Sequence, residues 1–284
     1  MAEYIKQLRK EEMLRRLERD LRNVEREKKM YLREPFNRIG AMAYFGDLYE
    51  RIGLDYIVGA EDITEGRKSF YKSMINWQWI YEHYNQNQDV VKYPFYLCSE
   101  SYRRMYFAVI SSDWTIATKI AGFYFEFQKL DEEPMEPYSV ELCNVMKYLI
   151  LDRDEECKSA LEILESLSVT DRHYKKMVEG QAIAVRGLLT KDEVLFNKGL
   201  LQVFKNHEAK VKREGNGIYG YFCYDGVALA MIGMRRGFNI TIEHEKLKPE
   251  YLEKSDIDYS QIVIDKEIYI TEEEFVNNKW GWCD

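Results

Sequence analysis

The residues whose types and spacing could perform chemistry are few in this chain. The segment 215–220, GNGIYG, has the GxGxxG spacing of a dinucleotide-binding loop. Such a loop must directly follow a β-strand, so that the amino end of the next helix faces the pyrophosphate. Here it follows the charged segment 207–213, HEAKVKR, which is typical of a helix end. We therefore interpret the glycines as a helix terminus and a loop, and we expect no bound cofactor.

The histidines, cysteines and paired carboxylates do not form a familiar reactive pattern either. They are far apart and include no CxxC or HExxH motif: His83, His173, His207 and His244; Cys98, Cys143, Cys157, Cys223 and Cys283. This spacing predicts neither a metal site nor a disulfide framework. Asp152 and Asp154 are better explained as a turn and a helix cap. A Cys–His or Ser–His pair that meets only in the fold stays open, but without a nucleophile elbow or a P-loop lysine we expect no enzyme.

Composition and charge narrow the class of protein further. The 284 residues include 5 Pro and 16 Gly, with 46% hydrophobic and 32% charged residues, which excludes disordered and collagen-like chains and favours long amphipathic helices. The most apolar stretch, 106–125, contains Asp113 and Lys119, so we expect no membrane span and a cytoplasmic protein. A net charge of −8 argues against direct nucleic-acid binding.

The charge is unevenly distributed along the chain. Residues 6–34 carry 11 basic and 7 acidic residues, whereas residues 241–284 carry 12 acidic and 5 basic residues. One interpretation is that both segments are simply solvated faces. The other is that the acidic C-terminal surface meets a basic protein partner.

The first segment has the pattern of one long helix that ends before Pro35. Leu14, Leu17, Leu21 and Val24 recur at spacings of three and four, as in a helical seam. We expect this seam to pack back onto the same chain, with dimerisation as the alternative, so that the protein is a monomer or a homodimer. Two more helices are predicted, at about 36–52 and from residue 62 or 64 to about 84.

From residue 98 onward, one pattern occurs three times. An apolar helix runs into a short turn with an aspartate and then into a second helix, and these aspartates, Asp113, Asp154 and Asp192, lie 41 and 38 residues apart. Each is placed to serve as an N-cap or first-turn residue. The pattern predicts an all-α fold of stacked antiparallel helical hairpins, similar to TPR or HEAT arrays.

The end of the chain departs from this helical pattern. Ile262–Ile264 and Ile268–Ile270 are typical of extended segments or a β-hairpin, so residues 255–284 are predicted to be an irregular or β appendage. We expect one helical domain over 1–284. The alternative is two subdomains, 1–133 and 134–284, separated at the Pro134 and Pro137 region.

Aromatic and acidic residues around the Gly-containing loop are the best candidates for contact with a partner. Most aromatic residues in such a chain belong to the core, but tyrosines also anchor protein interfaces. The predicted partner-binding residues are Tyr219, Tyr221, Tyr224, Asp225, Glu243 and Glu245. For Asp225, a helix cap is the competing interpretation.

A resemblance to a known family lies in residues 179–252. GQAIAVRGLLTKDEVLFNKGLLQVFKNH, followed by a Gly-containing loop, an Ala-rich helix, RRG and LKPEYL, resembles the immunity protein 49 family of bacterial polymorphic toxin systems. The segment GYFCYDGVALAMI is also similar to the immunity family of PoNe-type DNase toxins, but the Pro-Tyr pairs near the end of that family are absent here. The resemblance implies no catalytic residues.

The resemblance implies a cytoplasmic protein that binds a cognate toxin domain and blocks it. For an acidic inhibitor, a basic toxin is the natural partner, since complementary charge speeds association. The alternative hypothesis is a helical-repeat adaptor that binds a peptide or another protein. The adaptor would require a concave groove with exposed basic or aromatic residues.

Overall fold

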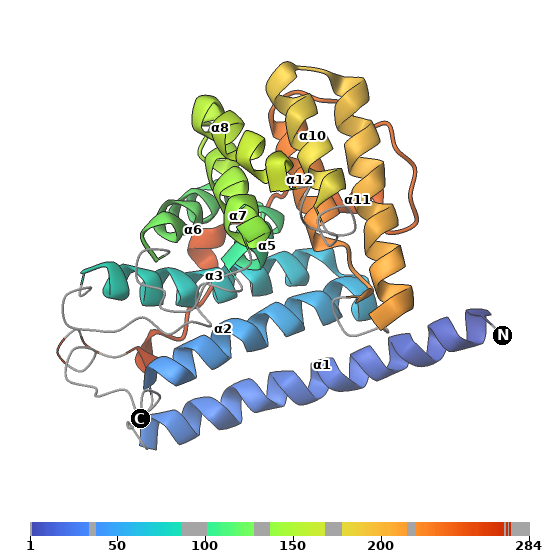
Figure 1. The fold of residues 1–284 in the computed structure, drawn as a ribbon. Helices are drawn as coiled ribbons and strands as arrows, with labels where there is room; N and C mark the ends of the chain where they lie inside the picture. The colour runs from blue at the N-terminus through green and yellow to red at the C-terminus, as the bar shows by residue number, and fades with distance from the viewer. Residues whose placement is uncertain are drawn as a thin grey trace. The chain divides into compact units, whose positions relative to one another are not determined.

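The computed structural model describes residues 2–33, 38–86, 101–127, 137–167, 178–214 and 220–269, together with residues 271 and 273. These ranges contain ten α-helices and no β-strand, and neighbouring helices pack antiparallel (Figure 1). The predicted all-α class is thereby confirmed, whereas a TPR-like or HEAT-like repeat stays a prediction. The chain forms two compact units, residues 1–93 with 256–284, and residues 94–255. The alternative boundary at 133 and 134 lies outside the described residues.

The first unit is built on three long helices. These are α1 (Ala2–Arg33), α2 (Arg38–Asp55) and α3 (Ile63–Gln86), with a π-helical turn, η2 (Tyr56–Ala60), between α2 and α3. Both α1 and α3 pack against α2, as Figure 1 shows. All three helices were predicted from the apolar spacing, whereas η2 was not.

The seam of α1 is displaced by one residue at two of its four positions. Leu17 and Val24 are buried as predicted, but Leu21 is 40% exposed. Met13 and Asp20 complete the buried stripe instead. Asp20 is stable there because its two carboxylate oxygens accept hydrogen bonds from Arg19 Nε and Arg51 Nε, each at 3.2 Å, so the buried charge is paired.

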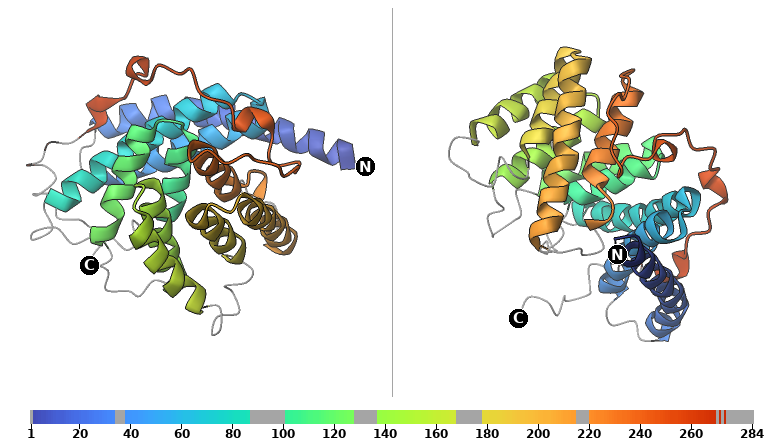
Figure 2. Two further views of the ribbon diagram at one scale, coloured as in Figure 1. Left: turned by 90° about the horizontal axis from the view of Figure 1, so that it is seen from above. Right: turned by 90° about the vertical axis from the view of Figure 1, so that its right-hand side faces the viewer.

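The C-terminal segment returns to the first unit without forming a hairpin. The described residues 256–269 contain two short 3₁₀ turns, η6 (Tyr259–Gln261) and η7 (Lys266–Ile268), and no strand (Figure 2). The β alternative is therefore wrong for these residues, and Ile270 lies outside them. At the expected hairpin turn, Asp265 accepts hydrogen bonds from Lys28 Nζ at 2.7 Å and Tyr49 Oη at 2.9 Å. These anchors to α1 and α2 replace a strand ladder.

The second unit contains three helical hairpins and one further helix. The hairpins are α5 (Ser101–Ile110) with α6 (Trp114–Phe127), α7 (Pro137–Ile150) with α8 (Asp154–Ser166), and α10 (Glu179–Thr190) with α11 (Glu193–Glu214). The last helix is α12 (Tyr224–Arg235), which packs against α5 and α11. Among the described residues, no helix combines the length and the apolar character that crossing a membrane requires.

The three predicted turns share one backbone feature. Each contains a residue with left-handed φ, namely Ser112 at 66°, Asp152 at 56° and Lys191 at 57°. The predicted capping role is confirmed for two aspartates, because Asp113 accepts from the Thr115 amide and Asp192 from the Leu195 amide, each at 2.8 Å. Asp154 is the first residue of α8, and its carboxylate binds Arg236 at 2.8 Å instead.

Candidate functional site

The predicted partner-binding residues divide into an inward group and an outward group. Tyr224 and Asp225 begin α12 and are half-buried. The Tyr224 ring packs on Tyr106 and Phe107 of α5, with centroids 5.9 and 5.3 Å apart. Tyr221 is half-buried as well. Tyr224 and Asp225 therefore contribute to contacts within the second unit. For Tyr221, Tyr224 and Asp225, contact with a partner stays a prediction.

The outward group consists of Glu243 and Glu245, which are both exposed. They lie in an irregular segment after α12, residues 238–248, which we call the strap. Tyr219 lies outside the described residues. The structure thus brings Asp225 and the two strap glutamates into the same unit but gives them different surroundings.

The strap is fixed to α11 by hydrogen bonds and apolar contacts. The Asn197 side chain donates to the Asn239 carbonyl at 2.9 Å and accepts from the Thr241 amide at 2.8 Å. The Phe238 ring packs edge-on against Phe196, with centroids 5.3 Å apart. Because these partners are side chains of one helix, the strap has a defined position on the second unit.

Exposure alternates along the strap in the way that the Glu-His-Glu sequence suggests. Glu243 and Glu245 are exposed, whereas His244 and Lys246 between and after them are half-buried. His244 stacks on Phe204, with centroids 4.8 Å apart, and its Nε2 lies 3.2 Å from a carboxylate oxygen of Glu208. The half-buried residues hold the strap against the second unit, so the two exposed glutamates are carried by an anchored backbone.

A group of buried and half-buried polar side chains gathers around the start of α12. They come from α5, α10, α11, the turn before α12, the first turn of α12 and the strap itself. We call this group the polar cluster, and its members are Tyr106, Gln181, His207, Cys223, Asp225 and Lys246.

Asp225 is the centre of the polar cluster. Its carboxylate accepts hydrogen bonds from the Cys223 thiol at 3.1 Å, the Gly226 amide at 3.0 Å and Gln181 Nε2 at 3.3 Å. The Gln181 side-chain oxygen in turn accepts from the Tyr106 hydroxyl, which is completely buried. These donors fix the Asp225 carboxylate in one orientation. Its role therefore goes beyond the helix cap that was the competing interpretation for this residue.

His207 and Lys246 meet at the carbonyl of Gly220. His207 Nε2 lies 3.1 Å from this oxygen and Lys246 Nζ lies 2.7 Å from it. Burial lowers the pKa of His207 below its ordinary value, which favours the neutral imidazole, although the charge of Asp225 works in the opposite direction. Burial likewise lowers the pKa of Lys246.

The cluster contains the residue types of a cysteine–histidine–aspartate triad but not its chemistry. Cys223 is completely buried, and burial together with the adjacent Asp225 carboxylate raises the pKa of its thiol well above the ordinary range. A reactive cysteine needs the opposite, namely an accessible thiolate in positive surroundings. The Cys223 thiol is therefore a poor nucleophile.

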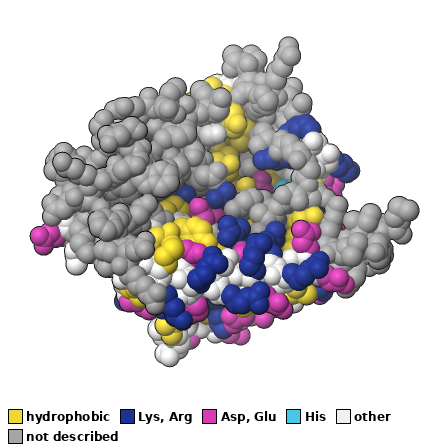
Figure 3. Space-filling view, turned by 90° about the horizontal axis from the view of Figure 1, so that it is seen from below, with side chains coloured by type: hydrophobic (Ala, Val, Ile, Leu, Met, Phe, Trp, Pro, Cys, Tyr) yellow, Lys and Arg dark blue, Asp and Glu magenta, His cyan; other side chains and the backbone are white. Residues whose placement is uncertain are grey.

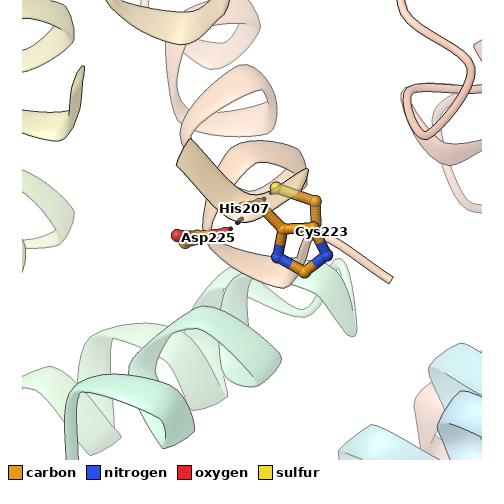
Figure 4. Close-up of side chains that lie close together, drawn as sticks. All are labelled: His207, Cys223 and Asp225. Carbon is orange, nitrogen blue, oxygen red and sulfur yellow. Dashed lines mark hydrogen bonds between the residues drawn. The ribbon is translucent and has the colours of Figure 1, made fainter. Parts of the chain in front are cut away.

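The same cluster has the donor types of a metal site. One ligand atom each from His207, Cys223 and Asp225 lies within 4.8 Å of the other two (Figure 4). His207 and Cys223 are 16 residues apart, so the short, fixed spacings by which metal ligands are found in a sequence do not connect them. The signal in the sequence was that His207 precedes the Gly-containing segment 215–220 and Cys223 follows it.

A second surface lies along α1 in the first unit. It is a hollow of about 550 Å³ lined by Glu12, Arg15, Arg16, Glu18, Arg19 and Arg22. Arg16 Nε is already held by Asp55 at 2.8 Å. Figure 3 shows Lys and Arg side chains interspersed with Asp and Glu on the face seen from below. This mixture differs from the clustered positive charge that tracks a phosphate backbone.

Comparison with known proteins identifies no relative: no family model, curated protein or solved structure matches this chain.

Proposed function

We propose that this protein is a cytoplasmic immunity protein, which binds a cognate toxin domain and neutralises it by covering its functional surface. The observation that carries the proposal is the anchored strap, on which Glu243 and Glu245 are both exposed. The residues that resemble the immunity protein 49 family, 179–252, are those that build α10, α11, α12 and the strap.

An anchored strap suits an inhibitor that must act before its toxin does harm. Because its backbone is already held by Asn197 and its inward side chains are packed, binding costs little additional ordering of the chain. Exposed carboxylates accelerate encounter with a positively charged partner. The net charge of −8 adds to that attraction. These properties support a basic toxin domain as the partner.

The proposal is tested by reversing the two strap charges. We expect the E243K/E245K double variant to bind the toxin encoded beside its gene about tenfold more weakly, mainly through slower association, because complementary charges chiefly set the association rate. Cells that co-express the toxin should lose protection in parallel. The matched control is E162K/E253K, which makes the same charge change at two exposed glutamates outside the strap and should protect like the wild type.

Two results would refute this function. Deletion of the gene could leave cells as resistant to the neighbouring toxin as before, in which case neutralisation is not its role. Alternatively, both double variants could weaken binding equally, in which case only net charge matters and the strap is not the binding surface. Circular dichroism and thermal unfolding of both variants establish that each one is folded.

A further inference from the structure

The polar cluster offers three different donor atoms to a single point. His207 supplies an imidazole nitrogen from α11, Cys223 a sulfur from the turn before α12, and Asp225 a carboxylate oxygen from the first turn of α12. Nitrogen, sulfur and oxygen donors together suit Zn²⁺, which accepts all three types, better than Mg²⁺ or Ca²⁺, which prefer oxygen alone.

The distances fit a small rearrangement into a tetrahedral site. Bonds of about 2.0–2.3 Å from Zn²⁺ place neighbouring ligand atoms roughly 3.3–3.6 Å apart. The Cys223 sulfur and Asp225 Oδ1 are 3.1 Å apart, and the largest separation within the three is at most 4.8 Å. Closing the site therefore needs side-chain movements of about 1 Å.

The surrounding hydrogen bonds orient two of the three ligands. Gln181 donates to Asp225 Oδ2 at 3.3 Å, which leaves Oδ1 directed toward Cys223. An Nε2–H of His207 that donates to the Gly220 carbonyl, 3.1 Å away, fixes the neutral tautomer in which Nδ1 carries the lone pair. Outer hydrogen bonds of this kind hold metal ligands in place in zinc proteins.

Charge balance favours the metal-bound state of the three ligands. The Cys223 thiol would give up its proton to solvent, and the resulting thiolate and the Asp225 carboxylate would together neutralise the two charges of Zn²⁺. A buried set with no net charge avoids the desolvation cost of an isolated ion. Lys246 is the opposing influence, because its ammonium on the Gly220 carbonyl repels a cation.

We infer that His207, Cys223 and Asp225 form a Zn²⁺-binding site that ties the C-terminal half of α11 to the start of α12. Water would be the fourth ligand, entering beside His207. The expectation of no metal, which was based on the sequence spacing of the histidines and cysteines, is replaced by this proposal. The inference is independent of the proposed immunity function.

Co²⁺ binding to the full chain, with Zn²⁺ as competitor, tests the site. Stoichiometric Co²⁺ should give tetrahedral d–d bands and a thiolate-to-cobalt charge-transfer band that Zn²⁺ abolishes. C223S should lose the charge-transfer band, and H207Q should weaken binding by more than about 100-fold. K246M should bind more tightly than the wild type, because it removes the opposing charge.

The chain supplies its own controls. Cys157 is a second completely buried cysteine, located in α8, so C157S should keep the charge-transfer band. C98S/C283S removes two cysteines outside the described residues and should also keep the band. Zn²⁺ at about 100 times its dissociation constant should raise the midpoint of thermal unfolding by roughly 5–10 °C. EDTA should reverse the rise.

The inference fails if stoichiometric Co²⁺ gives no thiolate band, or if the band survives in C223S. If C223S does not fold, H207Q keeps the test decisive, since it changes a half-buried side chain and leaves the sulfur in place. Wild-type affinity in a folded H207Q variant would overturn the site. Calorimetry in buffers of different ionisation enthalpy should detect the proton that the thiol releases when Zn²⁺ binds.

Discussion

Gly199, in the N-terminal third of α11, is a position where one added methyl group should destabilise the second unit strongly. A Cβ atom at Gly199 would lie 2.2 Å from the backbone nitrogen of Ala184 and 2.7 Å from its Cα, both in α10. Ordinary van der Waals contact begins at 3.4 Å. The two helices would therefore have to separate by roughly 1 Å in a close-packed interior. A backbone atom cannot turn aside as the end of a flexible side chain can.

Two opposing terms set the size of the effect of G199A. Overpacking costs about 1–3 kcal/mol and occasionally more, and a clash with main-chain atoms belongs at the upper end of that range. The helix preference of alanine over glycine contributes at most about 1 kcal/mol in the other direction. The net loss in the free energy of unfolding is therefore about 2 kcal/mol, or a fall of roughly 4–8 °C in the unfolding midpoint.

Gly122 provides the matched control within α6. It is exposed, and a Cβ there would have no neighbour within 4 Å. G122A should therefore gain about 0.5–1 kcal/mol from helix preference alone. Urea and thermal unfolding, followed by circular dichroism, compare the two variants directly. The reasoning is refuted if G199A equals the wild type in stability, or if G122A loses as much stability as G199A.

Two further perturbations test the electrostatics of each unit. Asp265→Ala removes the acceptor for Lys28 and Tyr49, so urea unfolding should show a loss of about 1–2 kcal/mol in the free energy of unfolding. Proteases should also cut residues 256–269 faster. If neither value changes, other contacts hold the segment. Because burial lowers the pKa of His207, the unfolded chain binds a proton more readily, and stability in EDTA should decrease as the pH falls below about 6.5. H207Q should flatten that decrease, and an equal slope in both proteins would contradict the assigned cause.

The positions of the helices were predictable because apolar residues at helical spacing leave few alternatives. Asp113 and Asp192 mark turns for a local reason, since an aspartate there caps the following helix with its own side chain. The register of α1 was less predictable. Leu21 is exposed while Asp20 is buried, and the ion pairs of Asp20 with Arg19 and with Arg51, 31 residues away, explain that choice.

The polar cluster could not be predicted from spacing, because its members come from several elements. His207 and Cys223 are 16 residues apart in sequence, and Gln181 comes from the preceding helix. What unites them is the close packing of α10 on α11 and the start of α12 against both α5 and α11. Glu243 and Glu245 were predicted as candidate contacts, but the burial of His244 between them depends on Phe204 and Glu208 of α11.

The acidic C-terminal region divides into parts with different roles. Asp265 and Glu267 both bind Lys28 in the first unit, so part of the negative charge counted over residues 241–284 is neutralised within the protein. Glu243 and Glu245 belong to the second unit and are exposed. A partner that binds the strap therefore meets a small pair of carboxylates rather than the full charge of the segment. Salt screens solvent-exposed charges most strongly. Because the strap offers a partner only two exposed carboxylates, association should slow only moderately as the salt concentration rises.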